Sequence, residues 1–243
     1  MPILQGSNSA RIHLPPLSAR LLAIADGLPR GGVICDVGSD HGALPLYLLS
    51  SGLCRSAVVT DLNPLPLSRA KQALTAAGFE GKVSFVLADG IADVLTFRPD
   101  AFVIAGMGGE TIVGILERAK EKLSFGSFFA LQPMTRSRQL RRYLYENGFY
   151  VAGERVVAEN GKVFLIFFAI FDGVERKRED TFYLFGEYLG SNPEPAVREY
   201  LNSCLLSLRS KIVGKEKAFL SVEAERTEER ILLSELEKLN EDF

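Results

Sequence analysis

The chain has 243 residues, of which 47% are apolar and 24% charged, the profile of a soluble globular protein with room for one α/β domain and an appendage. Its net charge of −2 argues against a surface coated in basic side chains, although a local basic stripe would still serve a nucleic acid. The three cysteines have no paired spacing, which argues against a disulfide framework or a zinc site, and we expect no metal. No apolar run reaches the roughly 20 residues of a membrane-spanning helix. Residues 1–16 lack a signal-peptide pattern, so we expect a cytoplasmic protein with no membrane partner.

The first two-thirds of the chain alternate β-rich runs with helix-patterned segments, which predicts a mostly parallel sheet covered on both faces. After an entry helix over residues 17–25, the expected strands are 33–37, 57–61, 83–88, 101–105 and 128–131. The helices expected between them are 44–51, 64–77, 110–122 and 137–147.

Two further β-patterned runs, 150–158 and 162–170, flank Glu159-Asn160-Gly161, and an Asn-Gly pair at this place is a strong hairpin signal. Dehydrogenase-type Rossmann domains do not require a terminal antiparallel hairpin, whereas seven-stranded methyltransferase sheets end in one. The pattern therefore predicts an α/β fold with a Rossmann-like methyltransferase sheet.

The composition changes after Asp172, where a charge run at 175–180 precedes the breaker cluster 192–195. Two helical stripes of apolar residues follow: Val197, Leu201, Leu205, Leu208 and Ile212, then Leu232, Leu233, Leu236 and Leu239. We expect two long antiparallel helices that bury these stripes against each other, resembling a coiled coil. The chain thus divides into a ligand-binding domain over 1–173 and a helical domain over 174–243.

The first strand leads into Asp36 and a glycine-rich turn, at the edge where open α/β folds bind ligands. Gly38 and Gly42 let the backbone pass close to a ligand, with Ser39 between them. A dinucleotide fingerprint would have glycine at the position of Asp40, because a carboxylate beside a pyrophosphate is electrostatically unfavourable. A carboxylate is acceptable beside the sulfonium and amino group of S-adenosylmethionine, so the turn favours a methyl donor over NAD.

The next two strands also end in acidic residues. Asp61, followed by Leu62, is placed to accept the ribose hydroxyls of an adenosine, and Asp89 or its backbone with Gly90 is placed to contact the adenine. Each carboxylate could instead be a solvated strand end. Three such ends in succession favour an adenosine-containing donor.

The fourth strand runs into Gly106-Met107-Gly108-Gly109 and lacks the Asn/Asp-Pro-Pro-Tyr-like loop of amino-methylating enzymes. We assign Gly106 to the donor site, and Met107, Gly108 and Gly109 to the acceptor site, because the glycines leave room for a bulky flat group. A plain tight turn that opens the helix at Glu110 is the alternative.

Four segments occur in a characteristic order: LSARL at 17–21, DVGSDH at 36–41, IAGMGG at 104–109 and LQP at 131–133. Together they resemble the bacterial tRNA (adenine-22-N1)-methyltransferase family over roughly residues 17–170. The resemblance implies S-adenosylmethionine-dependent methyl transfer to N1 of adenine 22 in a tRNA partner. The charged helical tail is similar to that family's coiled-coil domain.

The acceptor defines the chemistry that this resemblance implies. Adenine N1 has a lone pair and needs no base, so the enzyme must align it with the methyl group. The methylated base is cationic, and a nearby carboxylate would stabilise the developing charge. Our catalytic candidates are Asp40 and, as its hydrogen-bond partner or orienter, His41, although a helix-start histidine satisfied by backbone is equally compatible with the pattern. A flipped base also calls for a stacking aromatic, which the sequence does not locate.

The fifth strand is expected to end at Gln132 and Pro133, which we assign to substrate binding. The densest basic cluster in the chain follows, and we interpret it either as a phosphate-contact patch or as a solvated helix face: Arg136, Arg138, Arg141 and Arg142.

Three other functions stay open. The acceptor could be a small molecule or a protein, the chain could be a non-catalytic adenosine-binding module, or it could be a dehydrogenase. The set of donor residues disfavours the second, and the loop carboxylate with the hairpin disfavours the third. We expect a monomer.

Overall fold

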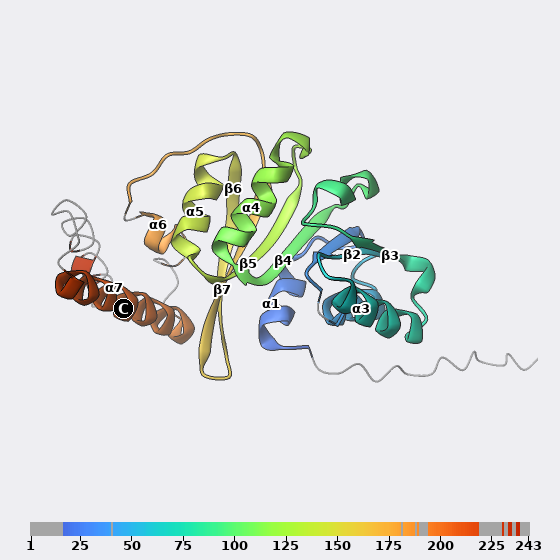
Figure 1. The fold of residues 1–243 in the computed structure, drawn as a ribbon, viewed down its shortest axis with the longest axis horizontal. Helices are drawn as coiled ribbons and strands as arrows, with labels where there is room; N and C mark the ends of the chain where they lie inside the picture. Colours follow the sequence, from blue (N-terminus) through green and yellow to red (C-terminus); the bar gives the residue numbers. More distant parts are fainter. Residues whose placement is uncertain are drawn as a thin grey trace, which may run out of the picture.

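The computed structural model describes residues 17–39, 41–180, 182–187, 189, 194–218, 230, 233–234 and 237–238, with side chains placed only as far as residue 210 in the last long helix. Its centre is a seven-stranded sheet of order β3-β2-β1-β4-β5-β7-β6 (Figure 1). The strands β1 to β5 are mutually parallel, and β7 lies antiparallel between β5 and β6. This topology confirms the fold expected from the sequence.

The strand bounds agree closely with the expected ones, apart from longer β4 and β5. The strands are β1 Val33–Val37, β2 Ser56–Asp61, β3 Val83–Leu87, β4 Ala101–Gly108, β5 Phe128–Thr135, β6 Phe149–Glu159 and β7 Lys162–Phe171. The strands β4 and β5 continue three or four residues further because they stay paired across an irregularity between Ala105 and Gly108. That irregularity lies within the glycine-rich run at the end of β4 and bends the strand at the ligand edge.

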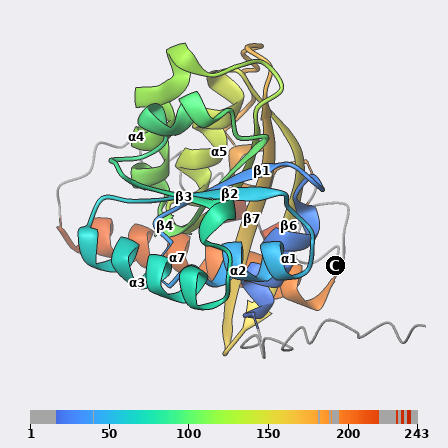
Figure 2. The same cartoon turned by 90° about the vertical axis from the view of Figure 1, so that its right-hand side faces the viewer.

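Helices cover both faces of the sheet (Figure 2). The helices are α1 Ala19–Gly27, α2 Ala43–Ser50, α3 Pro64–Ala76, α4 Gly109–Ala119, α5 Ser137–Glu146, α6 Phe182–Phe185 and α7 Pro195–Ala218. One apolar core lies under α1, α2 and α3, and a second core joins α4, α5, α6 and α7 to the opposite face. Within the described residues, no helix is long and apolar enough to cross a membrane.

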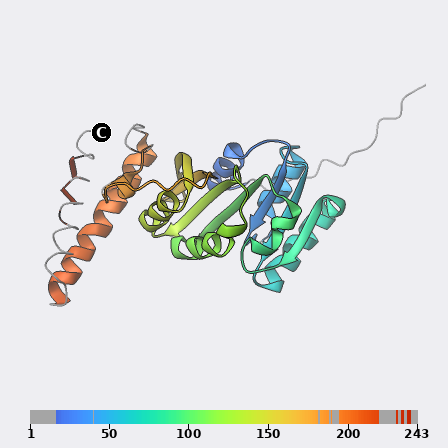
Figure 3. The ribbon, with the colours of Figure 1, turned by 90° about the horizontal axis from the view of Figure 1, so that it is seen from above.

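The apolar stripe of α7, which we expected to pack against a second long helix, is buried against strands of the sheet. Val197, Leu201, Leu205 and Leu208 belong to the same core as Leu165 of β7, and α7 packs against β6 and β7 (Figure 3). The side chain of Ile212 and all of Leu232, Leu236 and Leu239 lie outside the described residues. Leu233 packs against that core, and Arg209 Nη2 lies 2.6 Å from Glu237 Oε1. We keep the division at 173/174 as a proposal, since the chain leaves the sheet there.

Candidate active site

A cavity of about 400 Å³ lies at the carboxyl ends of β1 and β4, beside α1. Of the residues assigned from the sequence, it brings together Asp36, Gly38, Ser39, His41 and Gly106. Arg20, Leu21, Ala43, Leu44 and Ala105 complete its wall. Asp40 lies outside the described residues. The cavity is at the edge of the sheet where the sequence placed the donor.

The turn after β1 is built on two left-handed glycines. Gly38 has φ +72°, and its N–H donates to the Thr60 carbonyl at 2.8 Å. This positive φ favours glycine, and a Cβ here would also lie 2.3 Å from Cε of Met107, whose flexible side chain would have to move. Gly42, with φ +67°, begins α2 and packs on α3.

Asp36 places a carboxyl group in the wall of this cavity. The residue is only 7% exposed, and burial raises the pKa of its carboxyl to about 6. A hydrogen bond from Ser39 opposes the shift, and the charge of Asp61 adds to it. A buried carboxylate held beside a second one is destabilising in the free protein, and a cationic ligand would relieve that cost. The cavity therefore fits a ligand that carries an ammonium group.

The ends of β2 and β3 differ from each other. The Asp61 carboxylate accepts a hydrogen bond from the Asn63 N–H at 2.8 Å, and Leu62 beside it is exposed. The Asp89 carboxylate turns to α4, where it pairs with Arg118 at 2.9 Å. Gly90 is buried beneath Ile115. The Asp89 carboxylate is thus paired at the surface, and the assignment of Asp89 and Gly90 to the adenine stays a prediction.

Arg20 and Gln132 form a network that the sequence did not reveal. Gln132 Oε1 accepts hydrogen bonds from the Gly106 N–H at 3.1 Å and from the Arg20 guanidinium, and Gln132 Nε2 donates to the Pro133 carbonyl at 2.9 Å. Because Gln132 is 0% exposed, the expected substrate contact of this side chain is wrong, and its role is to hold Arg20 and the β4 loop. The two partners are separated by 112 residues, so no local pattern relates them.

Replacing Gln132 with Leu is expected to lower the free energy of unfolding by about 1–3 kcal/mol, because the Gly106 N–H and the Arg20 guanidinium lose their acceptor. Urea denaturation measures this loss, and Gln139→Leu on the exposed face of α5 is the matched control. Equal stability of the two variants would show that Gln132 holds nothing in place.

The role expected for Gly109 is also wrong. Gly109 is buried, and a Cβ there would lie 2.7 Å from the carbonyl oxygens of Thr135 and Arg136. The missing side chain therefore makes room for the protein's own β5–α5 connection, and leaves none for a substrate. Gly108 and Met107 are half-buried, and their assignment to the acceptor site stays a prediction.

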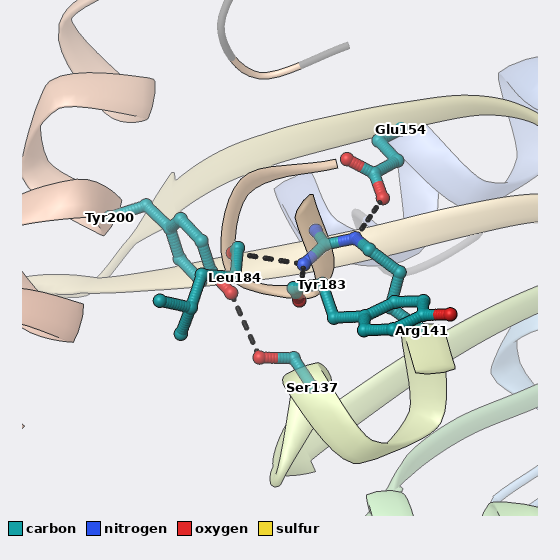
Figure 4. A network of polar contacts seen from close by, with 6 residues as sticks. All are labelled: Ser137, Arg141, Glu154, Tyr183, Leu184 and Tyr200. Carbon is teal, nitrogen blue, oxygen red and sulfur yellow. Dashed lines mark hydrogen bonds and ion pairs between the residues drawn. The ribbon is translucent and has the colours of Figure 1, made fainter. Parts of the chain in front are cut away.

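The basic cluster divides into one buried and three surface arginines. Arg141 is 0% exposed and pairs with Glu154 at 2.7 Å, so it cannot contact a phosphate and that expectation is wrong (Figure 4). Arg136 pairs with Glu110 at 3.0 Å, while Arg138 and Arg142 both pair with Asp180. Pro133, Arg136 and Arg138 line a separate cavity of about 320 Å³ beside α7.

Comparison with known proteins identifies the family of this fold. Residues 17–167 match the family model described as a methyltransferase domain. The chain is 33% identical over 153 residues to the tRNA (adenine(22)-N(1))-methyltransferase of Bacillus subtilis, and the match covers 63% of this chain and 64% of that enzyme, slightly under two thirds of its length.

Solved structures extend the similarity to most of the chain. The crystal structure of the B. subtilis m1A22 tRNA methyltransferase TrmK has a TM-score of 0.76 at 26% identity, covering 93% of this chain and 98% of that one. A candidate tRNA (m1A22) methyltransferase from Streptococcus pneumoniae, solved with S-adenosyl-L-methionine, has a TM-score of 0.81 at 27% identity, covering 93% and 100%.

The sheet order, the glycine turn and the family match define a methyltransferase domain, and the chain belongs to that family. Within it, the resemblance to the bacterial tRNA (adenine-22-N1)-methyltransferases is confirmed.

Proposed function

We propose that this protein transfers a methyl group from S-adenosylmethionine to N1 of an adenine in tRNA, at position 22 by its similarity to the B. subtilis enzyme. The observation that carries the proposal is the buried Asp36 in a glycine-walled cavity at the carboxyl edge of the sheet. The similarity to a structure solved with this donor supports the same assignment.

The donor would supply an electrophilic methyl group on a cationic sulfonium, and this chain has groups that suit its parts. Asp36 pairs with its ammonium group, and Gly38 lets the backbone pass close to it. Asp61 accepts the ribose hydroxyls, with Leu62 against the sugar or base. The backbone of Asp89 and Gly90 faces the adenine.

The acceptor reaction asks for positioning rather than for a base, since adenine N1 already carries a lone pair. The chain must hold N1 in line with the methyl group, exclude water and stabilise the cationic product. His41 lies in the cavity wall and is one candidate for this work. Asp40 remains the predicted carboxylate beside it.

The proposed partner is tRNA, contacted by phosphate-binding side chains at the start of α5. Arg136, Arg138 and Arg142 are partly exposed there, although each has an acidic partner that RNA would have to displace. The described part of α7 lies beside the cavity that Arg136 and Arg138 line, and we assign the helical domain over 174–243 to holding a large substrate. We propose that the protein acts in the cytoplasm as a monomer.

Incubation with methyl-labelled S-adenosylmethionine and unmodified total tRNA tests the proposal. After nuclease digestion, the label should appear in 1-methyladenosine, and a tRNA transcript with guanine in place of adenine 22 should stay unlabelled. Intact donor binding without any label in RNA would overturn the proposed acceptor.

Donor affinity should depend on pH through Asp36. Its pKa of about 6 in the free protein means that the carboxylate must lose a proton before it pairs with the donor's ammonium group. Affinity should level off near pH 7 and fall up to tenfold per unit below pH 6, as one proton competes with the donor. Isothermal titration calorimetry between pH 5 and 7, where the donor's amino group stays protonated, measures this slope. A flat profile would show that Asp36 does not pair with the donor.

A further inference from the structure

A second cavity opens next to the donor cavity. It also measures about 320 Å³, but it is distinct from the cavity beside α7. It is lined by Arg20, Met134, Glu159, Asn160, Lys162 and Phe164. Arg20 lines both cavities, so one guanidinium is the wall that they share. None of the other five residues belongs to the donor cavity or to the sites assigned above.

The sheet register explains why the tip of the β6–β7 hairpin reaches this place. Leu131 of β5 pairs with Phe167 of β7, and the two strands are antiparallel. Continuing that register brings Met134 level with Phe164, and residues 159–162 lie beyond them at the carboxyl edge of the parallel strands. Figure 1 shows the hairpin extending past the rest of the sheet on the side of α1. The second cavity is therefore on the catalytic edge, beside the donor.

Three contacts hold the side chains of this cavity in place. The Arg20 guanidinium lies over the Phe164 ring at 5.5 Å and also donates to Gln132 Oε1. The backbone N–H of Arg20 donates to Glu159 Oε2 at 3.2 Å, and this hydrogen bond fixes the start of α1 to the hairpin. Met134 is 48% exposed, and its thioether adapts readily to an aromatic surface.

We propose that this second cavity takes the target adenine, with Phe164 as its stacking platform; the inference rests on the proposed function. An aromatic ring and a guanidinium plane are groups on which an unpaired base stacks, and a thioether packs well against an aromatic surface. Their place beside the donor cavity fits a base flipped out of the RNA. Phe164 is thus the aromatic that the chemistry demands and the sequence did not locate.

Two charged residues at the hairpin tip give the cavity further features. The Glu159 carboxylate lines the same cavity, so in this base site its charge stabilises the ring, which becomes cationic when N1 gains a methyl group, more than it stabilises the neutral substrate. Lys162, opposite Glu159 in the register, is placed for a phosphate beside the flipped nucleotide.

Replacing Phe164 with Leu tests the stacking platform in the full-length protein. Methylation of an unmodified tRNA transcript should fall about tenfold to hundredfold in kcat/KM, the range expected from the loss of one base–aromatic stack. The Kd for S-adenosylmethionine should change by less than twofold. Phe164→Tyr should retain activity within about threefold, because it keeps the aromatic face. Tyr150→Leu, an exposed aromatic at the far end of β6, is the matched control.

Glu159→Gln separates charge from packing, since the amide oxygen still accepts the Arg20 N–H. It should lower kcat about tenfold while KM for tRNA stays within threefold.

The outcomes distinguish the two proposals. Full activity of Phe164→Leu, or an equal loss in Phe164→Tyr, would overturn the base site and leave the proposed function standing. An unchanged kcat in Glu159→Gln would overturn the role of its charge. A wild-type protein that binds the donor and makes no 1-methyladenosine would overturn the proposed function, and the base site with it.

Discussion

Replacing Asp36 with Asn should weaken S-adenosylmethionine binding at least about 100-fold, because a buried charge pair loses one partner. The same change should stabilise the donor-free protein. Burial moves the pKa of this carboxyl from 3.8 to about 6, and each unit corresponds to about 1.4 kcal/mol. The free energy of unfolding at pH 7 should therefore rise by up to about 3 kcal/mol. Calorimetric titration and thermal denaturation measure the two effects.

The stabilisation should depend on pH in a definite direction. Because the folded-state pKa of Asp36 is raised, its protonation favours the fold at low pH, and wild-type stability is lost as the pH rises from about 4 through about 6. Asp36→Asn should thus match wild type near pH 4 and exceed it above pH 6. Asp93→Asn, at an exposed carboxyl, is the control and should differ from wild type at neither pH. A lower melting temperature for Asp36→Asn at pH 7 would contradict the assignment.

A site that is costly when empty is useful for binding. The free protein keeps Asp36 near Asp61, whose charge adds to the cost of ionising the buried Asp36. A cationic donor removes that cost on entry, so part of its affinity comes from relief of repulsion. Asp36, at the end of β1, thus lowers the stability of the free protein and raises its affinity for the donor.

Features that depend on neighbouring residues could be predicted from the sequence. The sequence combines a strand, an acidic residue and two glycines within ten positions, from Val33 to Gly42, and the structure builds part of the donor cavity from them. The β6–β7 hairpin follows from its Asn-Gly turn, since Asn160 and Gly161 both have positive φ. These signals are local because backbone conformation is set by adjacent residues.

Features that depend on distant partners could not be predicted in the same way. The Arg20–Gln132 network joins α1 to the end of β5, and neither residue has a neighbour that indicates the other. Gly109 was misassigned for the same reason, because the backbone that fills its missing Cβ comes from the β5–α5 connection. Arg141 had a usable signal, since it shares the buried face of α5 with Leu140, Leu144 and Tyr145. We grouped it with the neighbouring arginines as one basic cluster and therefore missed that signal.

Replacing Arg141 with Met should lower the free energy of unfolding by about 3–5 kcal/mol, the range for breaking a buried ion pair from one side. Arg141 Nε donates to Glu154 Oε1 at 2.7 Å, and Nη1 donates to the carbonyls of Tyr183 and Leu184 at 2.6 and 2.9 Å (Figure 4). One guanidinium thus joins α5 and β6 to α6, the segment that leads to α7. Urea denaturation measures the loss.

Arg142→Met is the matched control, because that neighbour is 39% exposed and its pairing with Asp180 should contribute less than about 1 kcal/mol. A second comparison isolates the charge. Burial raises the pKa of Glu154 even with Arg141 beside it, so this carboxylate is costly to keep charged at its buried position. Arg141→Met with Glu154→Leu should therefore recover most of the stability that Arg141→Met loses. A double variant as unstable as the single one would assign the loss to the α6 carbonyls instead.

The stability of Arg141→Met should also depend on pH in a way that the stability of Arg142→Met and of the double variant does not. Without the guanidinium, the buried Glu154 carboxyl has no opposing charge, and its pKa rises further above the ordinary range. A raised folded-state pKa means that stability is greatest at low pH and is lost as the carboxyl ionises. Arg141→Met should thus approach wild-type stability near pH 5 and fall away from it above pH 7. A deficit independent of pH would show that the lost hydrogen bonds to α6, and not the stranded charge, cause the destabilisation.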